Sequence, residues 1–230
     1  WRYTGGNSLT LVNSGPGFMP NADGSVRLTA AESALYAAGV KMNEAGNTDL
    51  TFFKFALDGS TVVVKHWHSS SPPGNDKAGG ILVKDDGTVV VFGGFESSPS
   101  LGYSAYWQYD AAGNLNAGYP KTFVGAATLY AGTKLGPTLY AVNNGTEPVV
   151  VTLDGSGNTI AGGEGLQGSG GLFPSGSFAA PGGAVLAGTG GTNEQDRAVL
   201  IDTVTAGGPF LYVTLTSTPG SVGSGGAALA

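Results

Sequence analysis

The chain has no cysteine among its 230 residues. This absence excludes disulfide bonds, thiolate nucleophiles, iron–sulfur clusters and cysteine-ligated zinc. Charged residues are also scarce at 11%, and their balance is acidic, with 16 Asp and Glu against 10 Lys and Arg. Because no basic cluster is present to neutralise phosphate groups, nucleic acid is not expected among the partners.

Long apolar runs are missing as well. None approaches the roughly 20 residues of a membrane-spanning helix, so membrane insertion is not expected. Glycine, in contrast, is abundant at 41 residues, but the strict Gly-X-Y period of collagen is absent. The 3 Trp, 9 Tyr and 10 Phe add to a hydrophobic content of 41%, enough to build a packed core. The composition is therefore typical of a β-rich domain with many turns.

An internal repeat is the strongest positive signal in the sequence. Four turns anchored by Asp58, Asp110, Asp154 and Asp202 each follow an apolar segment, at intervals of 52, 44 and 48 residues. A period of about 48 residues is what four short strands and their turns occupy in one blade of a β-propeller. The sequence therefore predicts an all-β fold built from four-stranded units.

Each unit contains recognisable strand patterns between these turns. The first strand is represented by residues 80–83, which lead into the Asp86-Gly87 turn, and Asp-Gly between apolar runs is a strong hairpin signal. Second strands are expected at residues 35–39, 89–94, 139–142 and 185–188, and third strands at 50–57, 103–109, 148–153 and 197–201. Fourth strands are expected at residues 61–65 and 210–215, with a weaker pattern around 159–160.

The positions of these units lead to a specific architecture. Four complete units span about residues 24–216, while residues 1–23 supply late strands and residues 219–230 an early strand of another unit. Combining strands from both termini in one blade leaves no open sheet edge. We therefore predict a single domain over residues 1–230, a β-propeller of five blades closed by the two termini. The alternatives are a fragment of a longer propeller and another repetitive all-β fold.

Residues 30–44 carry a conflicting helix signal. Thr29-Ala30-Ala31-Glu32 has the pattern of a capping box, and Gly46 stands where a helix could stop. Residues 35–40 nevertheless occupy the position that strongly β-like runs fill in the other units. Because agreement between repeats outweighs local propensity, a strand is predicted here and a helix is the alternative.

Several short motifs carry a resemblance to a known class of proteins. They are Gly79-Gly80-Ile81-Leu82-Val83 with Asp86-Gly87, Val91-Phe92-Gly93-Gly94, and Tyr109-Asp110 with Gly113-Asn114. In this pattern the chain resembles the β-propeller repeat proteins, particularly bacterial extracellular propellers and five-bladed lectins of the tachylectin type. The resemblance implies an extracellular location or a place on a cell or virion surface. The chain has no set of equivalent sugar-contacting residues, so no lectin binding residue is carried over.

The sequence offers no coherent catalytic, metal or cofactor site. His66 and His68 are the only two histidines, and no Gly-x-Ser-x-Gly motif accompanies them. Their spacing places both imidazoles on one face of a strand, but zinc needs at least a third ligand, for which Asp76 is only a conjecture. The turn aspartates are interpreted as structural, because Asp side chains accept hydrogen bonds from turn amides. No catalytic residue, metal or cofactor is predicted.

Aromatic residues provide the candidate ligand contacts. Trp107 shares a strand face with Tyr103 and Tyr109, whereas Tyr106 points to the opposite face. Trp107 and Trp67 are predicted to bind a ligand, because an indole ring offers a large apolar face and one N–H donor; packing in the core is the alternative role of both.

Three functional hypotheses follow. The leading hypothesis is a noncatalytic recognition or adhesion module that binds a glycan or a protein surface through its loops. The second is a structural subunit of an extracellular assembly or appendage, which includes self-assembly of the chain. The third is a glycan-cleaving enzyme, in which a pair of carboxyl groups from different blades would act on the sugar.

Overall fold

The structure of the chain is a computed structural model that describes residues 2–3, 9–10, 27–31, 34–57, 60–67, 74–98, 101–123, 128–135, 138–144, 148–165, 172–180, 183–190, 195–202 and 210–214. These residues belong to two compact units, residues 1–123 and residues 124–230. The prediction of one domain over residues 1–230 stays a prediction.

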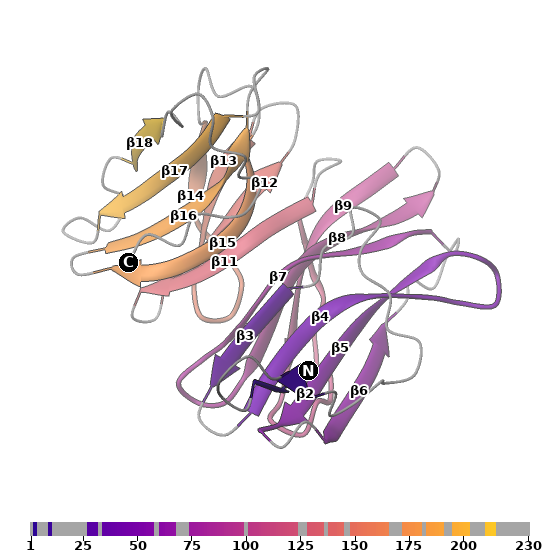
Figure 1. Cartoon of the computed structure of the whole chain (residues 1–230). Helices are drawn as coiled ribbons and strands as arrows, with labels where there is room; N and C mark the ends of the chain where they lie inside the picture. The colour runs from indigo at the N-terminus through magenta and orange to yellow at the C-terminus, as the bar shows by residue number, and fades with distance from the viewer. Residues whose placement is uncertain are drawn as a thin grey trace. The chain divides into compact units, whose positions relative to one another are not determined.

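The described residues form an all-β structure without a helix, as the strand ribbons of Figure 1 show. Unit 1 contains sheet 1, made of β3 (Arg27–Ala31), β4 (Ala34–Met42), β5 (Thr48–Ala56) and β6 (Thr61–Trp67). It also contains sheet 2, made of β7 (Asp76–Val83), β8 (Val89–Ser98), β9 (Leu101–Tyr109) and β10 (Lys121–Phe123). Near the N-terminus, β1 (Arg2–Tyr3) pairs with β2 (Leu9–Thr10).

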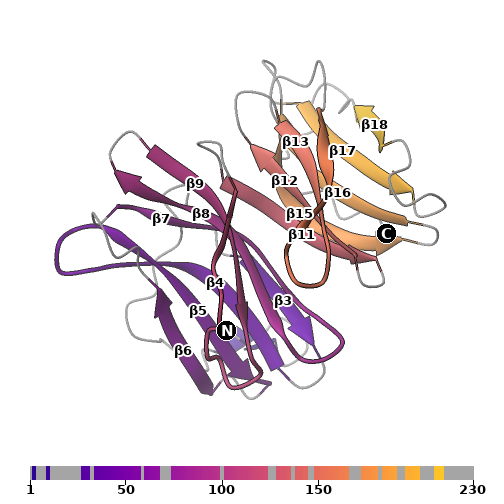
Figure 2. The same ribbon diagram turned by 180° about the vertical axis from the view of Figure 1, so that it is seen from behind.

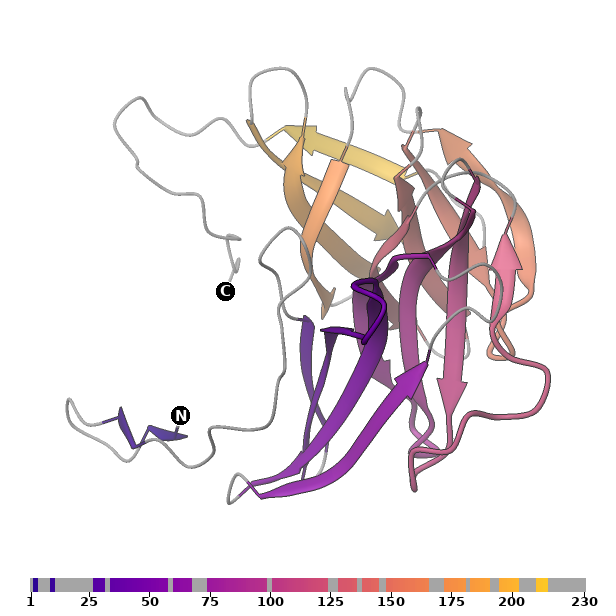
Figure 3. The same ribbon diagram turned by 90° about the vertical axis from the view of Figure 1, so that its right-hand side faces the viewer.

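Unit 2 repeats this arrangement in two further sheets, which Figure 2 shows from behind. Sheet 3 consists of β11 (Thr128–Leu135), β12 (Thr138–Asn144), β13 (Pro148–Leu153) and β14 (Thr159–Gly165). Sheet 4 consists of β15 (Leu172–Ala180), β16 (Gly183–Gly190), β17 (Gln195–Asp202) and β18 (Phe210–Thr214). In all four sheets each strand pairs antiparallel with the next one along the chain, and the strands are twisted (Figure 3). Among these residues there is no helix that could cross a membrane.

The four-stranded repeat predicted from the sequence is confirmed. The second strands are β4, β8, β12 and β16, and the third strands are β5, β9, β13 and β17, at the expected places. The weak signal around residue 159 belongs to a real fourth strand, β14. The alternative of a helix over residues 30–44 is wrong, because β3 and β4 occupy this region and β4 pairs along its length with β5. The repeat pattern overrides the local capping signal.

One five-residue loop recurs at four of the turns. In each loop the first residue donates its N–H to the carbonyl of the fifth, over 2.8–2.9 Å, and the N–H of the fourth returns to the carbonyl of the first. The fourth residue is always a glycine with a φ of 80–82°, a left-handed conformation that favours glycine. The loops are residues 43–47, 84–88, 110–114 and 154–158.

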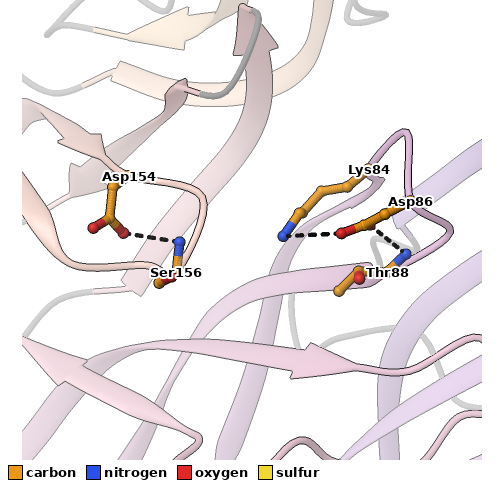
Figure 4. A network of polar contacts seen from close by, with 5 residues as sticks. All are labelled: Lys84, Asp86, Thr88, Asp154 and Ser156. Atoms are coloured by element: carbon orange, nitrogen blue, oxygen red, sulfur yellow. Dashed lines mark hydrogen bonds and ion pairs between the residues drawn. The ribbon is translucent and has the colours of Figure 1, made fainter.

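The side chains of the turn aspartates bind backbone amides, as predicted for Asp110 and Asp154. Asp154 Oδ1 accepts hydrogen bonds from the N–H groups of Ser156 at 2.8 Å and Asn158 at 2.9 Å, and the first of these is drawn in Figure 4. Asp110 Oδ1 accepts from the N–H of Asn114 at 2.7 Å. Hydrogen bonds from Asn158 and Asn114 hold the pKa of each carboxyl below its ordinary value. The hydrogen bonds predicted for these two side chains are therefore present.

The other turn aspartates differ in how far they are described. In the loop of residues 84–88, Asp86 Oδ1 accepts from the N–H of Thr88 at 2.9 Å, and its Oδ2 lies 3.7 Å from Lys84 Nζ (Figure 4). Asp58 lies outside the described residues. Asp202 ends β17, but its side chain is not among those described. Within the described turns, Asp and Asn side chains therefore stabilise the backbone by accepting hydrogen bonds from its N–H groups.

A β-bulge recurs in the first strand of sheets 2, 3 and 4. The register to the second strand shifts between Ala78 and Gly80, between Tyr130 and Gly132, and between Pro174 and Gly176. The residue after each shift is a glycine, and the three glycines are 52 and 44 residues apart. Because a bulge bends its strand and increases the local twist, the first strands of these sheets share a common distortion that the sequence did not reveal.

The core of unit 1 lies between sheets 1 and 2. Strand alternation sends one face of each sheet into it, with Phe52 of β5 stacked on Tyr36 of β4 at 6.2 Å and on Tyr109 of β9 at 5.3 Å between ring centroids. The remaining buried members are Ala34, Ala38, Leu50, Ala78, Ile81, Val89, Val91, Ala105 and Trp107. The two sheets therefore stack through a continuous apolar layer.

The loop of residues 110–114, which follows β9 of sheet 2, contacts β5 and β6 of sheet 1. Lys54 Nζ donates to the carbonyl of Ala111 at 3.3 Å, and Lys65 Nζ lies 3.5 Å from Asn114 Oδ1. A Cβ atom at Gly113 would come within 2.5 Å of Val63 Cγ1 on β6. Glycine is thus required at residue 113 both by its backbone conformation and by this close approach.

Replacing Gly113 by Ala should therefore destabilise the chain more than replacing Gly46 by Ala. Both residues have nearly the same left-handed φ, but a Cβ atom at Gly46 would meet nothing within 4 Å. The shared backbone term should cost about 1 kcal/mol, and the overlap with Val63 should add about 1–3 kcal/mol at Gly113 alone. Denaturant unfolding of both variants measures the difference, and equal losses would show that the loop does not pack on β6.

Candidate functional site

Four aromatic side chains gather in unit 1 where β6 ends. The ring of Trp67 lies edge-on to Phe95 at 5.2 Å and to Trp107 at 5.1 Å between centroids. Phe95 in turn lies 6.4 Å from Trp107 and 5.5 Å from Tyr103. These separations are within the range of favourable edge-to-face and tilted aromatic pairs. The cluster joins the edge of sheet 1 to the middle of sheet 2.

Trp107 forms the buried end of this cluster. Its side chain is 0% exposed, and its Nε1 has no hydrogen-bond partner among the described residues. The ring lies over Gly93, where a Cβ atom would stand 3.2 Å from Trp107 Cζ3 and would overlap the carbonyl oxygen of Lys77. Trp107 therefore has no exposed surface with which to touch a ligand, and the geometry supports the alternative role of packing in the core.

Trp67 lies at the partly exposed end. Its side chain and that of Phe95 pack against the core and retain part of their surface, and Tyr103, which contacts Phe95, is also partly exposed. We call these three residues the aromatic rim. The structure thus separates the two predicted tryptophans, with Trp107 as the buried support and Trp67 in a position from which a ligand can be touched.

Polar groups of β5, β7 and β8, and of Asn75 just before β7, adjoin the aromatic rim. Thr48 donates through its N–H to Asn75 Oδ1 at 3.2 Å and through its hydroxyl to the carbonyl of Asp76 at 3.0 Å. The N–H of Leu50 donates to Asp76 Oδ2 at 3.2 Å, and Asn75 Nδ2 donates to Glu96 Oε2 at 3.2 Å. We call these five residues the clasp, because they connect sheet 1 to sheet 2.

Strand register ties the clasp to the aromatic rim. Leu50 pairs with Trp67 across β5 and β6, and Asp76 pairs with Phe95 across β7 and β8. The hydrogen bond between Leu50 and Asp76 therefore links the cross-strand partners of two rim residues. A change in the clasp should be felt directly at the rim.

The carboxyl group of Asp76 is the most perturbed acid in the site. Its residue is 1% exposed, and its Oδ1 has no hydrogen-bond partner among the described residues. Burial raises the pKa of Asp76 to about 8, the charges of Asp49 and Glu96 add to the rise, and the hydrogen bond from Leu50 opposes it. Asp76 is therefore mostly protonated at neutral pH.

The histidine pair is only half visible. His66 is exposed on β6 with its Nδ1 2.9 Å from Thr51 Oγ1, and His68 lies outside the described residues. Partial burial, followed by the charge of Lys41, lowers the pKa of His66, while the charge of Asp49 opposes this shift. In the described part of the chain, no three His, Cys, Asp or Glu side chains meet in a way that could hold a metal ion.

Sequence reasoning located part of this site. The division of β9 into two faces is confirmed, because Tyr106 packs on the other side with Phe92 at 5.5 Å and Tyr119 at 5.8 Å. The roles of Phe95, Glu96 and Asp76 were missed. The only available signal for Phe95 was its alternation with Val91 along β8, which does not show that it ends beside β6.

No protein family model matches the chain, and no curated protein matches it. Among solved structures, the crystal structure of the computationally designed Ika4 protein aligns with a TM-score of 0.48 and 10% sequence identity. The alignment covers 84% of this chain and 99% of that protein. At this level of similarity it carries no argument about fold or function.

Truncating Trp107 should damage the core of unit 1. Trp107→Ala is expected to lower the free energy of unfolding by about 3–5 kcal/mol, because it leaves a large cavity beneath the rim. Trp67→Ala should cost clearly less, since part of that side chain is already in water. Denaturant midpoints of the two variants test this order, which would be overturned if Trp67→Ala proved the more damaging change.

Proposed function

We propose that the chain is a noncatalytic recognition module that binds a glycan or a protein surface through the aromatic rim. The observation that supports this proposal is the partly exposed cluster of Trp67, Phe95 and Tyr103, which rests on the buried Trp107. Rigid aromatic side chains lose little conformational entropy on binding, so a supported cluster is a favourable contact surface. We also propose a place on a cell or virion surface, on the ground of the resemblance of the repeat pattern to extracellular propellers.

The chemistry of the aromatic rim suits a sugar ring. Aromatic faces pack against the C–H groups of sugars, while nearby amide and carboxylate groups select the hydroxyls. Asn75 and Glu96 provide such groups. Glu96 follows Phe95 on β8, Asn75 precedes Asp76, the cross-strand partner of Phe95, and both are partly or fully exposed. A glycan is therefore the first ligand to test, and a protein surface is the second.

A glycan-cleaving enzyme is less well supported. Such an enzyme needs two carboxyl groups that both reach the scissile bond, one of them held protonated. Asp76 has the raised pKa of an acid, but its carboxyl is buried between the sheets rather than open to a substrate. The described turn aspartates have lowered pKa values and are engaged with backbone amides.

A structural role in an assembly is supported by the second face of sheet 1. The turn after β5, in which the N–H of Ala56 donates to Ser60, corresponds to the turn after β9, in which Asp110 donates to Asn114. This match makes Leu35 equivalent to Val89 and Phe55 equivalent to Tyr109. Leu35 pairs with Phe55 across β4 and β5, just as Val89 pairs with Tyr109 across β8 and β9. Sheet 2 uses Val89 and Tyr109 to pack on sheet 1, yet Leu35 is 45% exposed.

We further propose that this second face of sheet 1 packs on another sheet of the same repeat, as in a propeller. The repeat supports this arrangement, because in stacked sheets of one design each sheet uses one face for the sheet before it and the other for the sheet after it. A five-bladed ring closed by strands from both chain ends is the form that we propose. The chain has 26 residues before β3 and 16 after β18 from which the closing strands could come.

Binding should depend on Trp67. The full chain is first screened on an immobilised glycan array, and the affinity of the Trp67→Ala variant is then measured for any glycan retained. Loss of a central aromatic contact should weaken binding at least about 30-fold, or about 2 kcal/mol. Leu57→Ala is the matched control, because Leu57 is exposed at the opposite end of β6. Unchanged affinity of a folded Trp67→Ala variant would exclude the rim as the main binding site.

Closure of the ring should depend on the N-terminal residues. Deleting residues 1–17 should lower the melting temperature and promote self-association, because a sheet edge would be left without its partner. Sedimentation and thermal melting of the truncated chain measure both effects. A truncated chain as stable and as monomeric as the full chain would contradict closure and leave the open-fragment alternative.

A further inference from the structure

Asp76 stands at the junction of the two sheets of unit 1. It is the first residue of β7, the strand of sheet 2 that packs against β3, β4 and β5 of sheet 1. Its Oδ2 accepts the hydrogen bond of Leu50 and its carbonyl accepts that of Thr48, so both bonds cross between the sheets. Its Oδ1 is buried without a hydrogen-bond partner among the described residues.

The charges around Asp76 disfavour its ionised form. Asp49 on β5 and Glu96 on β8 are both negative, and each opposes a further negative charge at Asp76. On β9 the neighbouring titratable group is Tyr109, whose own pKa is raised by burial and by Asp76. On β4 the charge of Lys41 acts on His66, and the side chain of Arg27 on β3 is not among those described. Lys77, the next residue of β7, is exposed, and no cation is among the groups that shift the pKa of Asp76.

We propose that Asp76 is a proton-dependent latch between sheets 1 and 2, which holds the end that carries the aromatic rim closed while its carboxyl is neutral and releases it when the carboxyl ionises. A neutral carboxyl can stay in the clasp at small cost, whereas a carboxylate with one unpaired oxygen and two negative neighbours cannot. Opening the clasp lets water reach the charge.

The direction of the pH effect follows from the raised pKa. Between the ordinary value of 3.8 and the folded value of about 8, the closed form holds a proton that the open or unfolded form has lost. The closed form therefore loses stability as pH rises through this interval, and the full loss is reached above the folded pKa. Most surface carboxyl groups act in the opposite direction, since their stabilising interactions are lost in acid.

The latch reaches the proposed binding surface through the strand ladders. Leu50 and Asp76 are the cross-strand partners of Trp67 and Phe95, so separation of the clasp would separate two members of the aromatic rim. Alkaline pH should therefore alter the rim before unit 1 unfolds. The latch itself does not depend on what the rim binds, and it is tested without any ligand.

The test is the pH dependence of thermal melting of the full chain, from about pH 5 to about pH 9, in the wild type and in Asp76→Asn. Asn retains an oxygen for the hydrogen bond of Leu50 but cannot ionise. The wild type should lose melting temperature toward high pH, and Asp76→Asn should lose at least about 5 °C less over the same interval. Asp86→Asn is the control, because Asp86 is an exposed turn residue with a lowered pKa and should keep the wild-type dependence.

A direct measurement on the wild type covers the case in which Asp76→Asn fails to fold. Carbon-13 NMR of the side-chain carboxyl groups should show one aspartate that titrates several units above the others, accompanied by loss of the near-ultraviolet circular dichroism of the Trp67–Trp107 pair. If every carboxyl titrates below about pH 6, or if Asp76→Asn keeps the wild-type slope, Asp76 is not a latch.

Discussion

The stacking of sheet 1 on sheet 2 is the interaction on which the rest of unit 1 depends. Strand alternation places Phe52, Tyr109 and Trp107 in one apolar layer, and the layer sets the distance between the two sheets. At that distance the clasp can form at one end of the interface and the loop of residues 110–114 can reach β6 at the other. The polar contacts thus follow from apolar packing rather than directing it.

Local features of the sequence were enough to predict the second and third strands of every four-stranded sheet and their order, but not the residues of β3, β10, β11 or β15. Asp-Gly turns, and turns that run from Asp to Gly-Asn, indicate where strands end. The agreement between repeats corrected the misleading helix signal at residues 30–44. The clasp could not be predicted in this way, because Leu50 and Asp76 are 26 residues apart and lie in different sheets. Alternation also placed Trp107 on the right face of β9 but could not show that Gly93, on the neighbouring strand, leaves room for its ring.

The aromatic rim and the clasp differ from the repeated parts of the fold, because they include a buried acid. Four of the described turns share one geometry, but the junction between β5 and β7 carries an acid that this geometry does not require. A buried carboxyl with one oxygen that has no hydrogen-bond partner in the described part of the chain weakens the fold at neutral pH and above. A loss of stability of this kind is typical of functional positions, where a buried polar group stands in place of a well-packed apolar residue.

The five-residue loops have a consequence for how the surface of this protein can change. Their backbone is held by the first, fourth and fifth residues through two hydrogen bonds and one left-handed glycine. The second and third residues are Glu44 and Ala45 in one loop, Asp85 and Asp86 in another, and Ala111 and Ala112 in a third. Charge and size therefore vary at these tips while the strands beneath keep their register, so the tips form an array of interchangeable surface positions on a constant frame.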